Sequence, residues 1–234
     1  MLLYNRPQWS RKEAFPINDA FQKLDPEKQR RIWDAVIKEF AQNGYAKAST
    51  NRMVQEAGIG KGMLFYYFNS KEDLFRSALE YSIDFISRAY VEKLDFSSPD
   101  FITRMKQAVE TKMRAYLENP MPFVLVANLH IHQDAAELVP DLKKRLDDMA
   151  AERMADFFAN VDTTLFRDDV PPEHVLNLIR WSIDGWSNEI IASLQQVNLT
   201  DYDWDSSVKE FYEFLAVLRR VLYKEVDHGD SEGQ

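Results

Sequence analysis

Cysteine is absent from the 234 residues of this chain. Its absence excludes disulfides, thiol catalysis, and zinc or iron–sulfur sites built on thiolates. Long apolar runs are also missing, since none approaches the roughly 20 residues that a membrane-spanning helix needs. Residues 1–9 lack the apolar core of a signal peptide. We therefore expect a cytoplasmic protein without a membrane span.

Glycine is scarce, and signals for β-strands are missing. Only 7 glycines occur, and four of them lie between residues 44 and 62. No stretch alternates apolar and polar residues with β-branched enrichment, and no repeat of about 20–50 residues is present. Apolar residues recur instead at helical spacing, as Ile32, Val36 and Phe40 do. This pattern predicts an all-α fold of about nine helices.

Capping residues and breaks in the pattern set the expected helix limits. The first clear helix begins after Asp25, which can cap it, with Pro26 in the favoured first position. It is expected to end at Gly44, where a left-handed C-cap is easily formed. Other helices are expected over residues 17–23, 49–57, 61–68, 71–94, 100–118, 123–134, 140–160, 173–196 and 204–226. The tail over residues 227–234 is expected to be disordered.

Charge is divided unevenly along the chain. The net charge of −9 argues against a nucleic-acid partner, because phosphate contacts require Lys and Arg. Residues 1–75, however, hold 12 basic and 9 acidic side chains, whereas residues 76–234 hold 17 and 29. We therefore divide the chain into an N-terminal extension (1–25), a mildly basic module (26–75), an acidic helical body (76–226) and a tail (227–234).

Residues 49–68 carry the pattern of a helix-turn-helix, in which two short helices are joined by a turn containing glycine. Gly58 permits the positive φ that the turn needs, and the small Ala57 lets the helices approach closely. Leu64 and Phe68 lie one turn apart, so they hold the second helix on the first. The face expected to point outward consists of Lys61, Met63, Phe65, Tyr66 and Tyr67.

The run from Thr50 to Leu74, with its core 57–68, resembles the DNA-binding domain of the tetracycline-repressor-like (TetR) family over about a fifth of the chain. The resemblance implies an N-terminal three-helix DNA-binding domain over residues 26–75, followed by a helical ligand-binding and dimerisation domain. It implies a homodimeric transcriptional regulator, usually a repressor, that acts on double-stranded DNA at a palindromic operator. A small apolar or aromatic molecule would release it from that operator.

The resemblance also implies a set of DNA contacts, with the second helix of the motif in the major groove. Thr50 and Lys71 would contact phosphate, Tyr66 and Tyr67 the backbone or sugar, and Lys61 the guanine edge. Two departures remove hydroxyl groups, because Phe65 stands where the family commonly has tyrosine and Gly60 where it has Ser or Thr. The predicted DNA-binding residues are Ser49, Thr50, Asn51, Lys61, Gly62, Met63, Phe65, Tyr66, Tyr67 and Lys71.

The last two helices are apolar on two sides. Val175 and Ile179 belong to one stripe of the first of them, and Leu178 and Trp181 belong to a second stripe. A helix that is apolar on two sides buries two sides. We therefore predict a homodimer that forms a four-helix bundle through residues 173–196 and 204–226, with a two-layer monomer core as the alternative.

An effector pocket is expected among the helices over residues 100–196. The predicted ligand-binding residues are Phe123, Asn128, His130, His132, Phe157, Trp181 and Trp186. Their aromatic character favours an apolar or aromatic ligand, although a core would contain the same residue types. The two histidines are two positions apart and face different sides of a helix, so no metal site is expected. No catalytic triad, paired-carboxylate or phosphate-loop pattern appears, and we expect neither an enzyme nor a cofactor.

Two other functions stay open. The chain could be an all-helical enzyme or ligand carrier whose front module only packs, which predicts a monomer without DNA affinity. It could instead bind another protein through its last two helices, and a homodimer in solution would argue against that. The basic residues of the extension, Arg6, Arg11 and Lys12, either reach DNA as an arm or pack on the body.

Overall fold

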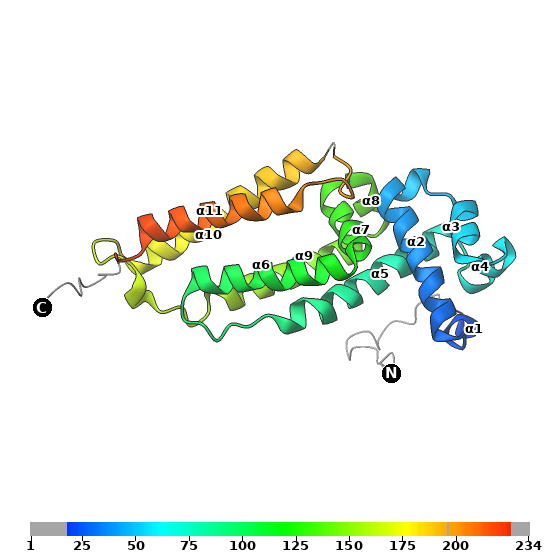
Figure 1. Ribbon diagram of the computed structural model, residues 1–234, viewed down its shortest axis with the longest axis horizontal. Helices are drawn as coiled ribbons and strands as arrows, with labels where there is room; N and C mark the ends of the chain where they lie inside the picture. The colour runs from blue at the N-terminus through cyan, green and yellow to red at the C-terminus, as the bar shows by residue number, and fades with distance from the viewer. Residues whose placement is uncertain (1–17, 196, 226–234) are drawn as a thin grey trace, which may run out of the picture.

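The computed structural model describes residues 18–195 and 197–225, and it is elongated and built of helices (Figure 1). Eleven α-helices and two short 3-10 helices occupy these residues, which contain no strand and only one isolated bridge between Phe166 and Tyr223. The predicted all-α fold is confirmed, with more helices than the nine expected. The predictions for residues 1–17 and for the tail lie outside the described residues.

The N-terminal module forms one end of the molecule, from α1 (Asp19–Gln22), α2 (Pro26–Lys47), α3 (Thr50–Ala57) and α4 (Lys61–Tyr67) (Figure 1). Asp25 caps α2 as predicted, since its side chain accepts a hydrogen bond from the Glu27 N–H at 2.9 Å. Gly44 has a φ of 65° and breaks the helical geometry, but helical hydrogen bonding continues to Lys47. The predicted helix end at Gly44 is therefore a kink.

The body consists of two helical layers (Figure 1). One layer holds α10 (Pro172–Leu194) and α11 (Trp204–Leu222), and the other holds α5 (Lys71–Ala89), α6 (Phe101–Glu118) and α9 (Pro140–Phe158). Two 3-10 helices, η2 (Val91–Lys93) and η3 (Thr163–Leu165), lie in the connections. None of the helices in residues 18–195 and 197–225 has the length and apolar character needed to cross a bilayer.

Two shorter helices replace the single helix predicted over residues 123–134. They are α7 (Pro120–Ile131) and α8 (Gln133–Leu138), which are separated by the extended residue His132. Pro120 begins α7 rather than preceding it, because proline is well suited to the first position of a helix. The helix predicted over residues 71–94 ends earlier, at Ala89.

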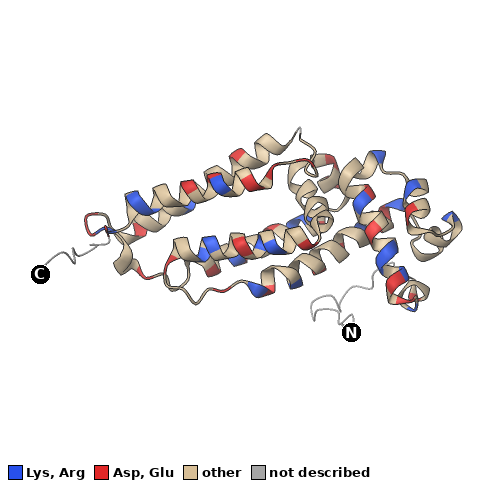
Figure 2. Ribbon diagram, viewed as in Figure 1, with Lys and Arg blue, Asp and Glu red and all other residues tan. Residues whose placement is uncertain are grey.

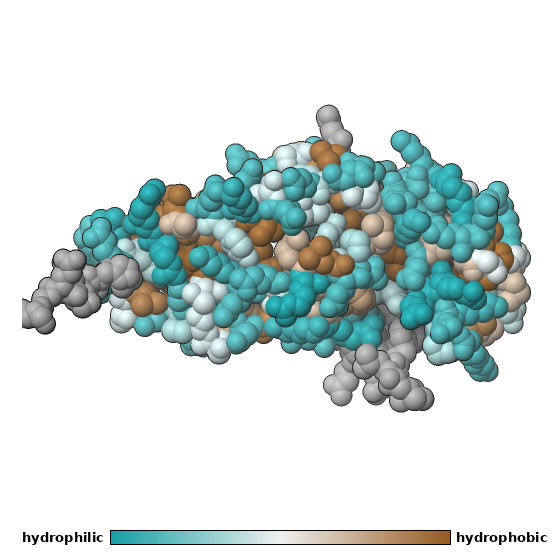
Figure 3. Space-filling view, in the orientation of Figure 1, coloured by the Kyte–Doolittle hydropathy of each residue, from teal (hydrophilic) through white to brown (hydrophobic). Residues whose placement is uncertain are grey.

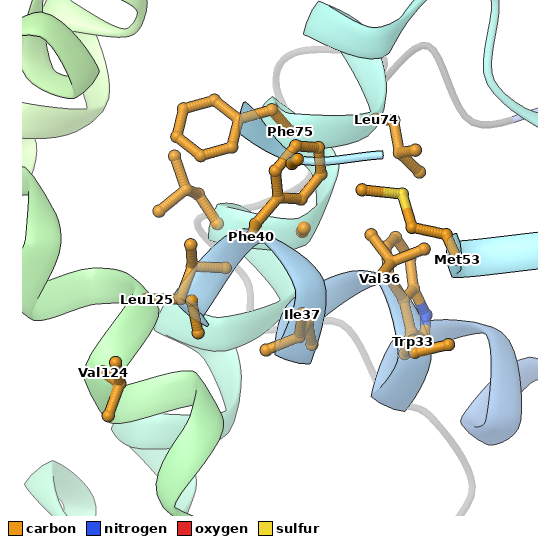
Figure 4. Close-up of a cluster of buried hydrophobic side chains, with 14 of the residues drawn as sticks. Trp33, Val36, Ile37, Phe40, Met53, Leu74, Phe75, Val124 and Leu125 are labelled. Carbon is orange, nitrogen blue, oxygen red and sulfur yellow. The ribbon is translucent and has the colours of Figure 1, made fainter. Parts of the chain in front are cut away.

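The buried apolar residues form two separate cores. The first core joins the N-terminal module to α5, α7 and α8 and includes Phe40, Met53 and Leu125. The second core lies among α6, α9, α10 and α11 and includes Phe101 and Ile179. In Figure 4, Met53 of α3 and Leu125 of α7 lie on either side of α2. Helix α2 therefore connects the helix-turn-helix to the body.

Arg104 ties the start of α6 to the end of α9. Arg104 is only 2% exposed. Its guanidinium donates to the carbonyl oxygens of Phe157 at 2.9 Å and of Ala159 at 2.6 Å. It also donates to the carbonyl oxygen of Ser98. The Phe157 and Ala159 carbonyls lie at the C-terminal end of α9, where a cation is favoured by the helix dipole.

Candidate nucleic-acid interface

The turn of the helix-turn-helix has the predicted geometry. Gly58 has a φ of 64° and a ψ of 40°, and this left-handed conformation ends α3. The next N–H group, that of Ile59, donates to the Val54 carbonyl at 3.0 Å. Ser49 caps α3 by accepting from the Arg52 N–H at 3.4 Å, whereas Gly60 offers α4 no side-chain cap. The departure noted at Gly60 therefore leaves the start of α4 without a hydroxyl.

One exposed surface carries most of the predicted DNA contacts, and we refer to it as the α3–α4 surface. Tyr66 is 56% exposed, Met63 41% and Phe65 36%, while Leu64 and Phe68 are buried beneath them as predicted. The surface consists of Asn51, Lys61, Gly62, Met63, Phe65 and Tyr66, all of which are exposed. Lys and Arg residues lie at this end of the molecule (Figure 2).

Tyr67 does not belong to this surface. It is 2% exposed and lies in the first core, where its ring contacts that of Phe21 at a centroid distance of 5.5 Å. Tyr67 follows Leu64 by three positions and so lies on the same inward side of α4. The prediction that Tyr67 points outward toward DNA is wrong, and its ring helps to hold α4 in place.

The residues just before α2, where a short helix is expected over residues 17–23 of the extension, also hold α4. Asn18 donates to two carbonyls at the end of α4, from its side chain to Tyr66 at 3.1 Å and from its N–H to Tyr67 at 3.2 Å. Phe21 of α1 is 2% exposed, and its ring lies 5.3 Å from Trp33 and 5.2 Å from Phe68. The sequence did carry a signal, because Asn18 precedes the short helix that contains Phe21.

A buried carboxylate fixes the start of α3. Glu39 of α2 is 6% exposed and accepts from the Ser49 N–H at 2.8 Å and from the Arg52 Nε at 3.0 Å. Burial alone would raise the pKa of Glu39, but these hydrogen bonds hold it below its ordinary value. Ser49 and Thr50, which begin this helix, are half-buried. The hydrogen bonds of Glu39 to Ser49 and Arg52 therefore position two of the predicted DNA-binding residues, Ser49 and Thr50.

Lys71 lies at the first turn of α5 and is half-buried. Its Nζ donates to the Ala46 carbonyl at 3.4 Å and stands 4.9 Å from the centre of the Tyr45 ring. This cation–π contact and the hydrogen bond hold the ammonium group against the end of α2. They also account for a lysine at a helix start, where the dipole disfavours a cation.

The seven predicted ligand residues lie in different parts of the described structure, and their role in ligand binding stays a prediction. Asn128 is buried in α7, where its side chain donates to the Ala41 carbonyl of α2 at 3.1 Å. Phe157 and Trp186 lie at the second core, and Trp181 is 60% exposed on the outside of α10. His130 lies 3.4 Å from Asp147, Phe123 contacts Phe85 and Tyr116, and His132 is half-buried between α7 and α8. Helical spacing identifies the apolar side of a helix but not the core that this side enters.

A groove of about 370 Å³ lies between α6 and α11. Its walls include Met113 and Leu117 from α6 and Val208 and Tyr212 from α11. None of the seven predicted ligand residues lines it. Within the described residues, no three His, Asp or Glu side chains gather as a metal site requires.

The outer face of α10 and α11 carries apolar side chains that the chain itself leaves uncovered. Leu178 is 43% and Trp181 60% exposed on α10, and Val217 is 45% and Val221 49% exposed on α11. The opposite sides of both helices are buried in the second core, through Ile179 and Leu215 among others. The two stripes predicted for these helices are therefore real, and only one of them is buried within the chain.

The chain also resembles known proteins. Residues 32–78 match the family described as bacterial regulatory proteins, tetR family. The repressor KstR of Mycobacterium tuberculosis is 25% identical over 75% of this chain and 75% of its own length. The uncharacterised HTH-type regulator YuxN of Bacillus subtilis is 41% identical over 58 residues, which are 25% of this chain and only 20% of YuxN. This chain thus spans about a fifth of YuxN.

Solved structures of regulators share the fold. The ketosteroid regulator KstR2 of Mycobacterium tuberculosis superposes with a TM-score of 0.57 over 87% of this chain and 98% of its own, at 17% identity. A TetR family regulator from Chloroflexus aurantiacus gives 0.55 over 89% and 99%, at 18% identity. The match of sequence covers the helix-turn-helix, and the likeness of fold covers the helical body behind it. Residues 32–78 thus match the TetR family of bacterial regulatory proteins, and the chain shares its fold with solved TetR family regulators.

Proposed function

We propose that this chain is a homodimeric repressor of transcription that binds a palindromic operator in the cytoplasm and is released by a small apolar or aromatic effector. The observation that carries the proposal is the α3–α4 surface, where Lys61, Met63 and Tyr66 are exposed on a helix whose other side is fixed in the first core. A major groove admits an α-helix, and α4 offers it donors and apolar tips. Repression is favoured because the similar protein KstR is a transcriptional repressor.

The side chains divide into two roles in this proposal. Asn51, Lys61, Gly62 and Met63 face the bases, since lysine donates to guanine O6 and N7 and asparagine pairs with adenine. The phosphate side falls to Ser49, Thr50, Phe65, Tyr66 and Lys71, with Tyr67 removed because it is buried. The net charge of +3 over residues 1–75 is small, but a dimer doubles it. The acidic body then repels phosphate and leaves contact to the motif.

Dimerisation through α10 and α11 would cover the apolar face that contains Leu178, Trp181, Val217 and Val221. We predict that Trp181→Glu converts the dimer to a monomer in sedimentation velocity, because it places a charge in that interface. Leu117→Glu is the matched control, because Leu117 is 73% exposed on α6 and lies away from this face. The dimer assignment fails when the Trp181 variant sediments as the wild type does.

Helix α7 offers a route from an effector to the motif. It packs on both α2 and α5, and the Asn128 side chain bonds the Ala41 carbonyl of α2. Figure 4 shows Leu125 of α7 beside Ile37 and Phe40 of α2. A ligand that shifts α7 in the body would therefore shift α2 and the helix-turn-helix that it carries.

The test is an electrophoretic shift assay with palindromic fragments from the chain's own promoter. Lys61→Ala should weaken specific binding by about 1–3 kcal/mol and relax the sequence preference. Lys71→Ala should weaken binding to all sequences and reduce the salt slope by about 1. A monomer that shifts no genomic fragment at low salt would contradict the proposal and favour an enzyme or ligand carrier.

A further inference from the structure

One lysine of α6 lies on the side of the helix that packs inward. Lys112 is four residues after Ala108 and three before Ala115, and these alanines are only 5% and 3% exposed. Residues at these spacings share a helix face. Lys112 is therefore a cation in a buried alanine stripe, where an apolar residue would be expected.

The surroundings of Lys112 combine two properties that a surface lysine does not have together. Its side chain is accessible to water, yet burial by the surrounding protein lowers its pKa. A side chain on the outer surface would be accessible without being desolvated, and a packed side chain would be desolvated without being accessible. Because Lys112 is accessible although it lies on the inward side of α6, space open to solvent lies beside it between the helices.

This position lies where the packing of the body is interrupted. Three buried residues, Ile83, Ala115 and Phe123, belong to neither the first nor the second core. Tyr116, one turn after Lys112, has its ring 5.9 Å from that of Phe123 and 5.7 Å from that of Trp204. Aromatic side chains from α6, α7 and α11 thus gather around Tyr116, one turn from Lys112. Figure 3 shows apolar side chains between the two helical layers on the face it presents.

Lys112 has no hydrogen-bond or ion-pair partner among the described residues. The other lysines of the body include pairs that are held by carboxylates, such as Lys143 with Asp147 and Lys144 with Asp148. Burial by the surrounding protein disfavours the charged form of Lys112, and an ammonium group in such surroundings is stabilised by an anionic partner.

We propose that Lys112 binds the acid group of the effector, and that the effector is an apolar molecule with one negative charge, represented by a monocarboxylate. The proposal rests on the function proposed above and names the chemistry of its ligand. Tyr116 and Phe123 form the apolar wall beside the acid group. One lysine compensates one charge, so a doubly charged phosphate would remain partly unpaired in the same space.

The test compares two ten-carbon probes on the full-length chain, decanoate and 1-decanol, by tryptophan fluorescence titration. The probes differ only in the polar end. A charge-assisted hydrogen bond predicts that the wild type binds decanoate at least about tenfold more tightly than 1-decanol. Lys112→Met keeps the length of the side chain and should reduce this preference to less than about threefold. Lys112→Arg keeps the charge and should preserve it.

Lys106→Met is the matched control. Lys106 belongs to the same helix but lies six residues away and on another side, so this variant should retain the preference for decanoate. Far-ultraviolet circular dichroism confirms that each variant is folded. The proposal is overturned when the wild type binds no decanoate, when it shows no preference for the acid, or when Lys112→Met keeps the full preference.

Operator binding measured in the same samples separates this proposal from the proposed function. If the chain binds DNA but shows no Lys112-dependent preference for decanoate, the proposed repressor function is supported and the anion site is overturned. If the chain prefers decanoate through Lys112 but shifts no DNA, the anion site is supported and the proposed repressor function is overturned.

Discussion

Phe21 provides a sharp test of how the DNA-binding surface is held. This residue lies outside the matched span 32–78, yet its ring contacts Trp33 of α2, Tyr67 of α4 and Phe68 at centroid distances of 5.3, 5.5 and 5.2 Å. We predict that Phe21→Ala destabilises the fold strongly. The substitution removes a 2% exposed aromatic ring from the first core and leaves a cavity between α1, α2 and α4.

The expected loss of unfolding free energy follows from the burial of the Phe21 ring. Replacing a buried phenylalanine by alanine costs about 3–5 kcal/mol, and Phe21 belongs near the lower end because α1 is short and can relax. A loss of about 3 kcal/mol lowers the melting temperature by about 6–12 °C for a chain of this length. Urea unfolding at one fixed protein concentration measures the loss, since dimerisation would make stability depend on concentration.

Phe65→Ala is the matched control, because it makes the same chemical change on the exposed side of α4. Phe65 is 36% exposed, so its removal should change the unfolding free energy by no more than about 0.5 kcal/mol while lowering operator affinity. The reasoning is refuted if Phe21→Ala unfolds within about 1 kcal/mol of the wild type. It is also refuted if Phe65→Ala is as destabilising as Phe21→Ala.

Two further predictions concern buried charge in the body. Burial raises the pKa of Glu80 to about 7, against the pull of Arg76 and Arg145, so its ionisation destabilises the fold as pH rises from about 4.5 to 7. At pH 8, the Glu80→Gln variant should therefore be more stable than the wild type by up to about 3 kcal/mol, and at pH 4 it should show no such gain. Urea unfolding at both pH values measures the difference, and an equal effect at the two values would contradict this prediction. Arg104→Met should cost about 3 kcal/mol or more, because it leaves the carbonyls at the end of α9 without donors; a loss below about 1 kcal/mol would show that water replaces the guanidinium.

The sequence predicted the elements whose limits depend on local chemistry. The helix expected over residues 100–118 is α6 (Phe101–Glu118), because Asp100 caps its start and the helix-ending Asn119 precedes Pro120. The left-handed Gly58 and the two short helices around it also follow from residues within one or two turns. Exposure of Lys61, Met63 and Tyr66 was predicted correctly for the same reason.

The sequence did not predict contacts between distant segments. Glu39 is an ordinary acidic residue of α2 until Ser49 and Arg52 come to it, and Arg104 meets Phe157 only through the packing of α6 on α9. The error at Tyr67 has a different origin, because Tyr67 was assigned to the outward face of α4 although it lies three positions after the inward Leu64.

Lys112 shows the same limitation in the search for a ligand site. The predicted ligand residues include Trp181, which is exposed, and Asn128, whose amide donates a hydrogen bond to α2. A lysine within a stripe of alanines was visible in the sequence. Its meaning depends on the interruption between the two cores, which is a property of packing and not of any one helix.

The central claim is that α4 reads DNA in the major groove as part of a dimer. Methylation interference with dimethyl sulfate tests it most directly, because the reagent modifies guanine N7 in the major groove and adenine N3 in the minor groove. The account predicts interference at guanine N7 in two symmetric half-sites whose centres lie about one helical turn, or a multiple of it, apart. Interference confined to adenine N3, or interference at a single half-site, would contradict it.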